Sequence, residues 1–212
     1  MPHRSLEPEV VVPLSAVLRE LGADADGHIS IGDITEHFGP RAFGTVLFVF
    51  GLLNLIPWPP GGTTITGTPL LLVAAQVAWG APTLWLPKRI TRLGFDRSLF
   101  SKGLDRVLPW LERLEKVSRP RLGFMFGPIA ERVLGLVCTL LAIIIVLPIP
   151  GGNLLPALAV TVLAISLVLL DGVIALIGYA LVACSAALLV LFAGMIVELF
   201  EGAYAWVRGF LG

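Results

Sequence analysis

Long stretches without a charged residue constrain this chain more than any other feature of its sequence. No Asp, Glu, Lys or Arg occurs between Arg41 and Lys88, between Arg132 and Asp171, or between Asp171 and Glu198. Hydrophobic residues make up 56% of the chain and charged residues 14%, against about 45–50% and about 25% in soluble domains. A soluble protein of this size has too few other residues to cover such stretches. The sequence therefore predicts an all-α integral membrane protein.

A regular repetition of short motifs divides the chain into two similar parts. Phe38-Gly39-Pro40 recurs as Phe126-Gly127-Pro128, and the apolar run after each ends in a break rich in proline and glycine, at residues 57–62 and 148–152. The two Phe-Gly-Pro motifs begin 88 residues apart, the two breaks begin 91 residues apart, and they end 90 residues apart. Isolated coincidences would not produce such a constant spacing. The sequence therefore predicts two tandem helix-break-helix repeats followed by a C-terminal transmembrane helix.

The helices expected before the breaks are short. Residues 42–56 and 133–147 would each form a helix of about 22 Å, less than the roughly 30 Å hydrocarbon core, so neither is expected to cross comfortably alone. Residues 172–197 would reach about 39 Å and can cross. Residues 57–68 and 148–153 are expected to be non-helical, because proline and Gly-Gly interrupt a helix. Two arrangements remain open: re-entrant hairpins that turn back within the membrane, or short hairpins whose breaks reach the far interface.

Charge along the chain indicates how it is organised across the membrane. Residues 88–121 hold ten basic and four acidic side chains, the bias of a loop retained in the cytoplasm. No recognition motif accompanies these basic residues, so nucleic acid is not an expected partner. The expected regions are a cytoplasmic amphipathic N-terminal region (1–41), membrane repeat 1 (42–87), a basic cytoplasmic linker with an amphipathic helix (88–127), membrane repeat 2 (128–171), and a C-terminal transmembrane helix with its tail (172–212).

Polar residues beside the two breaks are the candidate binding residues. Asn54 precedes the first break, Thr63 and Thr64 follow it, and Asn153 follows the second. Their amides and hydroxyls can coordinate a solute, and the free N–H groups of the following helix starts favour an anion or a sugar phosphate. The alternative is that they are capping and turn residues of a far-side loop.

Charged residues bordering the apolar stretches form a second set. Arg41 and the pair Glu131 and Arg132 follow the repeated Gly-Pro at equivalent places. We expect them either to form two equivalent halves of one site, on either side of an axis shared by the two repeats, or, more simply, to anchor the helices at the membrane interface. Asp171 lies between two apolar stretches, and we expect it to mark a turn at the membrane edge rather than a proton or cation site.

Outside the apolar stretches, leucine patterns predict surface helices. Leu14 to Leu21 and Leu104 to Leu114 have apolar residues at helical spacing, which favours packing against the membrane region or a second subunit. A homodimer is expected, because a few short helices cannot readily enclose two irregular breaks alone.

No motif indicates catalysis or a metal site. The signatures of serine hydrolases, zinc peptidases and phosphate-binding loops are absent, so we expect neither enzymatic activity nor a cofactor. Residues 22–33 resemble a calcium-binding loop in part. However, Gly22 stands at the first ligand position and Asp33 replaces the glutamate at the twelfth, which favours a capped helix start.

Three sequence strings together carry a resemblance to a known family. They are Asn-Leu-Ile-Pro-Trp-Pro-Pro-Gly (54–61), Trp-Leu-Pro-Lys-Arg (85–89) and Leu-Pro-Ile-Pro-Gly-Gly-Asn-Leu-Leu-Pro-Ala-Leu (147–158). The chain resembles the bacterial exopolysaccharide synthesis protein ExoD family over about residues 14–180. The resemblance implies a multi-pass protein of the bacterial inner membrane that is connected with exopolysaccharide production. It supplies no catalytic residue.

Two functions follow from these observations. The first is a small transporter or permease-like component whose polar site lies at the paired breaks and accepts an anionic or sugar-phosphate solute. The second is a scaffold or regulator that transports nothing and binds the polysaccharide-synthesis machinery through the basic linker.

Overall fold

The computed structural model describes residues 15–16, 19, 28–29, 42–56, 62–87, 95–96, 108–119, 121–147 and 152–211. Helices dominate these residues, so the predicted helical class is confirmed. They are α3 (Ala42–Asn54), α4 (Gly62–Trp79), the 3-10 helix η2 (Gly123–Phe126), α7 (Pro128–Val146), α8 (Leu154–Leu169) and α9 (Gly172–Leu211). A short antiparallel pair joins β1 (His28–Ile29) to β2 (Phe95–Asp96).

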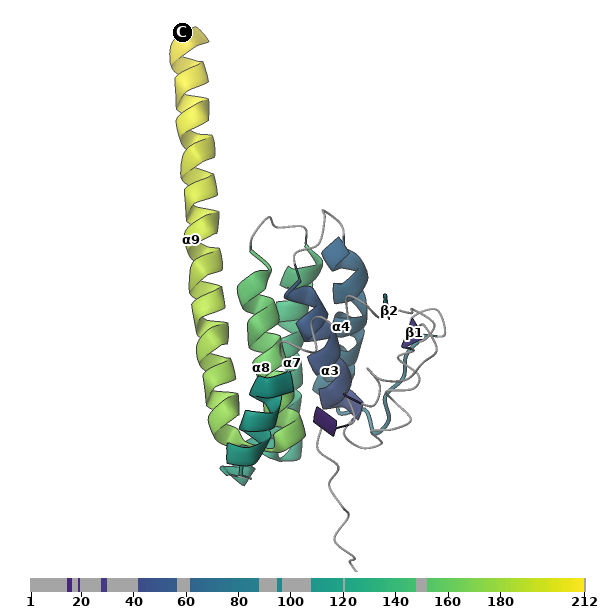
Figure 1. Ribbon diagram of the computed structural model, residues 1–212. Coiled ribbons are helices and arrows are strands. Elements are labelled where there is room, and N and C mark those ends of the chain that lie inside the picture. The colour runs from purple at the N-terminus through teal and green to yellow at the C-terminus, as the bar shows by residue number, and fades with distance from the viewer. Residues whose placement is uncertain are drawn as a thin grey trace, which may run out of the picture.

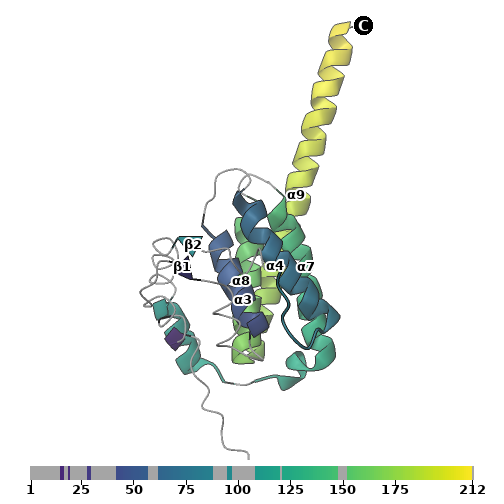
Figure 2. The ribbon, with the colours of Figure 1, turned by 90° about the vertical axis from the view of Figure 1, so that its right-hand side faces the viewer.

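Four helices form a bundle, and α9 lies along one side of it. Helix α9 contacts α8 and continues well beyond the end of the bundle (Figure 1). Within the bundle, α3 packs against α8 and α4 packs against α7 (Figure 2). The core therefore forms mainly between the two helical hairpins, because each hairpin supplies one helix to each of these pairs.

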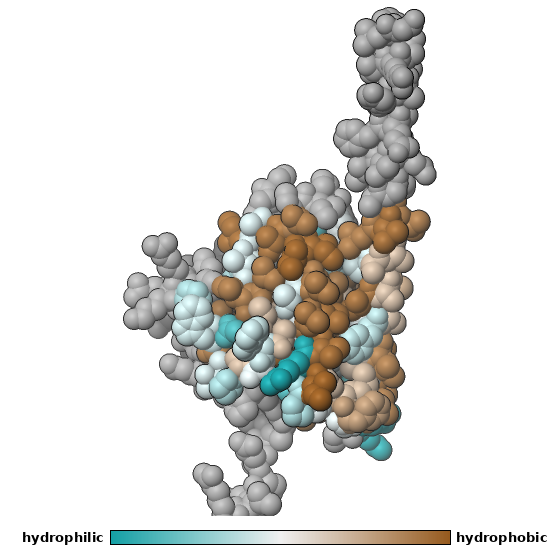
Figure 3. All heavy atoms as spheres, turned by 180° about the vertical axis from the view of Figure 1, so that it is seen from behind, coloured by the Kyte–Doolittle hydropathy of each residue, from teal (hydrophilic) through white to brown (hydrophobic). Residues whose placement is uncertain are grey.

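Helix α3 occupies the centre of the bundle. Every residue of α3 except Phe43 is buried, as expected for a helix that is apolar on all sides. Helix α7, in contrast, has a continuous exposed apolar stripe, formed by Ile129, Val133, Leu136, Leu140 and Ile143. Figure 3 shows hydrophobic residues gathered over the upper part of the bundle and along the described part of α9, with hydrophilic residues nearer the lower end.

Two helices are long and apolar enough to cross a membrane. They are Pro128–Val146 and Gly172–Leu191, with mean hydropathies of 2.4 and 2.5. Helices α3 and α8 are apolar but shorter. By length and composition, this part of the structure is compatible with the expected membrane protein.

Two helices begin earlier than the sequence predicted. Helix α7 begins at Pro128 rather than at residue 133, because proline is tolerated in the first helical turn. With 19 residues, it is a candidate span, so the expectation that it is too short was wrong. Helix α4 begins at Gly62, so the prediction of non-helical backbone up to residue 68 was also wrong.

Threonine side chains form hydrogen bonds to backbone carbonyl groups in the first turns of α4. The Thr66 and Thr68 hydroxyls donate to the Gly62 and Thr64 carbonyl oxygens one turn earlier, at 3.3 and 2.6 Å. The helix continues through Pro69, which only removes one backbone hydrogen bond. Helix α9 reaches Leu211, so residues 198–211, predicted as a tail, are helical.

Candidate functional site

The polar residues predicted to bind a solute lie at one end of the bundle, where α3 and α7 end and α4 and α8 begin (Figure 1). Asn54 is buried at the end of α3, and its Nδ2 donates to the Phe50 carbonyl oxygen at 2.8 Å. Its Oδ1 accepts a hydrogen bond from Thr66 Oγ1 at 2.7 Å. This bond connects the two helices of the first hairpin. Thr63 is half-buried in the first turn of α4.

The last carbonyl groups of α7 connect the two breaks. Such groups have no partner within their own helix. Asn153 Nδ2 donates to the carbonyl oxygens of Ile145 at 3.0 Å and Leu147 at 3.2 Å. Thr64 Oγ1 donates to the Val146 carbonyl oxygen at 3.1 Å. Because Thr64 belongs to the first hairpin and Val146 to the second, the helix ends that flank the two breaks lie side by side.

Asn153 contains a buried polar atom without a partner among the described residues. The residue is 9% exposed, and its Oδ1 accepts no hydrogen bond there. Such an orphaned acceptor costs about 1–3 kcal/mol. Asn153 also precedes α8 without capping it through its side chain. We call Asn54, Thr64, Thr66 and Asn153 the break cluster; its free acceptor is the Asn153 oxygen.

Thr66 was not among the predicted binding residues. It is buried and pairs with Asn54, whereas Thr64 is exposed. The signal that could have identified it is helical spacing, since a helix starting at Gly62 places Thr66 one turn further in. The pairing of Thr66 with Asn54 was not predicted, because the helix was expected to begin at Pro69.

The opposite end of the bundle contains a pocket of about 290 Å³. Its volume lies near the lower end of the range for small-ligand pockets, about 300–1,000 Å³. All four bundle helices contribute, and apolar walls come from Phe43, Val77 and Leu167. Glu131 and Arg132, two of the charged residues predicted at the membrane edge, both line this pocket. Arg41, the third, lies outside the described residues.

Arg132 lies against the C-terminal end of α4. Gly80 closes that helix with a φ of 73°, and its N–H donates to the Val77 carbonyl oxygen at 3.0 Å. A Cβ on Gly80 would lie 2.7 Å from Arg132 Nε. Glycine therefore permits the left-handed turn and leaves room for the guanidinium group. Within the described part of the chain, neither Glu131 nor Arg132 has a side-chain hydrogen bond or ion pair.

Asp171 lies in the turn between α8 and α9, where it caps α9. Its Oδ1 accepts from the Val173 N–H at 2.9 Å, and its Oδ2 accepts from Ser118 Oγ at 3.1 Å and the Arg119 N–H at 3.2 Å. Burial by itself would raise the pKa of Asp171. The three hydrogen bonds and the charge of Arg121 outweigh burial, so this pKa lies below its ordinary value.

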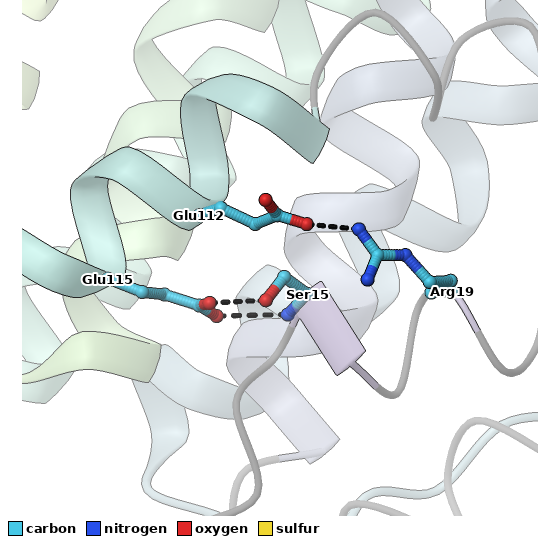
Figure 4. Close-up of polar contacts among 4 residues, drawn as sticks. All are labelled: Ser15, Arg19, Glu112 and Glu115. Carbon is cyan, nitrogen blue, oxygen red and sulfur yellow. Dashed lines mark hydrogen bonds and ion pairs between the residues drawn. The ribbon is translucent and has the colours of Figure 1, made fainter.

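The helix at residues 108–117 holds a piece of the N-terminal region. The Ser15 N–H donates to Glu115 Oε1 at 2.9 Å, and the Ser15 hydroxyl donates to Glu115 Oε2 (Figure 4). Arg19 forms an ion pair with Glu112 on the same helix (Figure 4). Two regions separated by 93 to 100 positions in the sequence are thus joined by charge-assisted hydrogen bonds.

The two faces of this helix differ. Leu108 and Leu111 pack into the apolar core of the bundle, and Leu111 is 1% exposed. Their part of the predicted leucine stripe therefore packs against the bundle. Trp110 faces outward with 66% exposure, and the Arg113 guanidinium lies 5.8 Å from its ring centre. Val117 is also exposed.

The acidic loop weighed as a calcium site lies outside the described residues, except for His28 and Ile29. Among the residues that the structure describes, no group of three or more His, Cys, Asp or Glu side chains is arranged to hold a metal ion.

Comparison with known proteins gives one family and two relatives. The family profile described as "Exopolysaccharide synthesis, ExoD" matches residues 14–191. "Uncharacterized protein slr1875" of Synechocystis sp. (strain ATCC 27184 / PCC 6803 / Kazusa) is 33% identical over 136 residues, which cover 63% of this chain and 64% of that protein. "Protein ExoD" of Rhizobium meliloti (strain 1021) is 29% identical over 176 residues, 78% of this chain and 71% of that protein. No solved structure matches.

Proposed function

Since this chain belongs to the ExoD family of exopolysaccharide-synthesis proteins, we propose that it is a small permease-like component of the bacterial inner membrane with its solute site at the break cluster. The family and the two long apolar helices together indicate a membrane protein involved in exopolysaccharide synthesis. The observation that carries the proposal for transport is that the helix ends flanking the two breaks meet at the carbonyl end of α7, beside the Asn153 oxygen, which has no partner among the described residues.

The two hairpins act as copies of one unit. Helix α3 packs against α8, and its counterpart α7 packs against α4, the counterpart of α8. Two close contacts support this correspondence: Gly44 touches Val168, and Gly135 touches Val77. The same separation of 91 residues relates the two glycines and the two valines. Repeated units that meet in the membrane commonly form solute sites where their helices are broken.

The hairpins enter the membrane from the cytoplasmic side. The basic residues 88–121 connect the end of α4 to the start of α7, and such a loop stays in the cytoplasm. Helices α3 and α8, with 13 and 16 residues, extend about 20 and about 24 Å. These lengths are shorter than the roughly 30 Å hydrocarbon core, whereas α4 and α7, with 18 and 19 residues, extend about 27 and about 29 Å. The helix ends beside the breaks therefore lie close to the far side of the core.

The chemistry of the break cluster favours an anionic solute. Helices α4 and α8 both begin there, and the first-turn N–H groups of a helix carry partial positive charge. The amide and hydroxyl groups of Asn153 and Thr64 exchange hydrogen bonds readily with the hydroxyls of a sugar. A sugar phosphate therefore fits both the helix starts and the polar side chains.

Flux into proteoliposomes tests this proposal, with radiolabelled glucose 1-phosphate as the probe. Asn54→Leu, Thr64→Val and Asn153→Leu each remove polar groups with little change in volume. We expect each to reduce flux about tenfold, as loss of one hydrogen bond to a charged group does. Thr139→Val is the matched control, because the Thr139 hydroxyl bonds only the Gly135 carbonyl of its own helix. No flux in the parent protein, or full flux in all three variants, would reject the proposed site.

A homodimer is the second part of the proposal. The apolar stripe of α7 from Ile129 to Ile143 is exposed, and an unpaired apolar face of this length is suited to a symmetric contact with another copy. Such a contact would also shield the backbone at the breaks from lipid.

One observation favours the alternative of a scaffold. The helix at 108–117 presents Trp110, Arg113 and Val117 outward, a combination of aromatic and basic residues that is enriched at protein interfaces. Photocrosslinking from position 117 to a polysaccharide-synthesis protein, together with absence of glucose 1-phosphate flux, would support the scaffold over the permease.

A further inference from the structure

The pocket between the starts of α3 and α7 is not used by the proposed permease site. It lies at the opposite end of the bundle from the break cluster, and both hairpins line it. Its lining is about as polar as it is apolar, and Phe43, Val77 and Leu167 supply apolar walls. Two charged side chains, Glu131 and Arg132, interrupt this lining from a single turn of α7.

The two charged groups are available to a ligand. No described residue forms an ion pair or side-chain hydrogen bond with either one. Glu131 is half-buried, and a charged group partly removed from water gains from a partner. Arg132 is exposed and lies against Gly80, where a Cβ would come within 2.7 Å of its Nε. The pocket therefore presents the guanidinium group of Arg132 and the carboxylate of Glu131 within one recess.

We propose that this pocket is a second binding site, for a phosphorylated sugar. Arginine binds phosphate through paired N–H groups, which is the strongest recognition this lining offers. Glu131 repels a bare phosphate but accepts hydrogen bonds from sugar hydroxyls. The apolar wall at Phe43 and Leu167 accommodates the C–H face of a sugar ring or the start of a lipid chain. The choice of a sugar rests on the proposed function in exopolysaccharide synthesis.

Ligand binding to the purified full chain in phosphatidylcholine nanodiscs tests the inference. Saturation-transfer NMR measures the affinity for glucose 1-phosphate and, through competition, for inorganic phosphate. We expect Arg132→Gln to weaken glucose 1-phosphate binding about tenfold to a hundredfold, as loss of a charge-assisted phosphate contact does. Arg132→Lys should bind with intermediate affinity, because it keeps the charge and loses the fork. Arg113→Gln is the matched control, since Arg113 lies on Trp110 outside the pocket.

Glu131→Gln distinguishes recognition of the phosphate group from recognition of the sugar. Removal of the negative charge should strengthen binding of inorganic phosphate and reduce the preference for glucose 1-phosphate. Two further variants check the geometry. Gly80→Ala places a Cβ 2.7 Å from Arg132 Nε and strains the left-handed turn, so it should weaken binding and lower the unfolding midpoint together. Gly123→Ala should change neither, because a Cβ there meets no atom within 4 Å. Unfolding midpoints of all variants show that they are folded.

A competition experiment with a lipid-linked sugar phosphate tests whether the natural ligand is lipid-linked or free. Nanodiscs that contain a polyprenyl-phosphate-linked glucose should exclude free glucose 1-phosphate if the natural ligand is lipid-linked, and should leave it unaffected if the ligand is free. Equal glucose 1-phosphate affinity in the parent protein and Arg132→Gln, or no saturable binding in the parent protein, would overturn the inference. Loss of binding in Thr64→Val but not in Arg132→Gln would assign the ligand to the break cluster alone, leaving the proposed function intact.

Discussion

At the scale of single residues, the polar side chains near the helix ends bond to backbone groups that the helices leave free. Asn153 and Thr64 donate to the last carbonyls of α7, and the Asp171 carboxylate accepts from the Val173 N–H in the first turn of α9. Each of these contacts satisfies a group that would otherwise be unpaired in an apolar environment. The role of such a residue is thus determined by its helix end as much as by its own chemistry.

Asp171→Asn should make the protein less stable and change how its stability depends on pH. The carboxylate has a folded-state pKa below its ordinary value. Its stabilising contribution is therefore complete above about pH 4, the unfolded value, and is lost as the pH falls through the lower folded value. We expect Asp171→Asn to cost about 1–2 kcal/mol at pH 7 and to converge with the parent protein in acid.

Thermal unfolding in detergent from pH 7 to pH 3 measures this difference. Ser118→Ala is the control, because it removes one donor to Asp171 and keeps the carboxylate, so it should cost less and retain the pH dependence. A constant difference between Asp171→Asn and the parent protein over the whole range would contradict the prediction.

At the scale of elements, glycines determine how closely the helices approach. Gly135 lies so near α4 that a Cβ on it would be 2.3 Å from the Ala78 nitrogen. At Gly44 the nearest obstacle is the end of a side chain, Val168 Cγ2, at 2.7 Å. A backbone atom cannot yield without moving its helix, whereas a side chain can shift by rotation or small displacement.

Gly135→Ala should therefore be more damaging than Gly44→Ala. We expect Gly135→Ala to lower stability by about 1–3 kcal/mol or more despite the better helix propensity of alanine, and Gly44→Ala to lower it less. Gly123→Ala should change it by less than about 0.5 kcal/mol, because the added methyl group meets open space. Unfolding midpoints in one detergent rank the three variants; an equal effect of Gly135→Ala and Gly123→Ala would show that α7 and α4 do not approach as described.

At the scale of the whole molecule, the two hairpins depend on each other for their core. Helix α3 is buried chiefly against α8 of the other hairpin, and α4 is buried against α7. A hairpin by itself would leave those faces uncovered. The exposed stripe of α7 is an apolar face of the bundle that remains for a further copy of the chain.

The proposed homodimer should have twice the mass of one chain in light scattering of the detergent-solubilised protein. Leu140→Cys in a Cys184→Ser background should form disulfide-linked dimers on oxidation, because Leu140 lies on the exposed α7 stripe and Cys138 is buried. Leu176→Cys on α9 is the matched control and should remain unlinked. A monomer mass in several mild detergents would contradict the dimer, and crosslinking through position 176 alone would place the contact elsewhere.

The sequence predicted much of the element pattern and less of the site. The breaks and the α8 start at Leu154 follow from proline and glycine, whose effect on the backbone is local. The starts of α4 and α7 were predicted too late in the sequence. Proline and charged residues are tolerated in the first turn of α7, and the threonine-rich segment before Pro69 is part of helix α4. The Asn54 and Thr66 pair was missed for the same reason.

Composition and local covalent structure determined the apolar character of the chain, its helical class and the positions of its breaks, because these properties depend on residues close together along the sequence. The tertiary structure alone decided which groups meet. Thr64 reaches Val146 across 82 positions of sequence, and Glu131 and Arg132 share a pocket with residues of the other hairpin. Such contacts depend on how whole helices pack, and helix packing is set by the combined shapes of many side chains rather than by any local pattern.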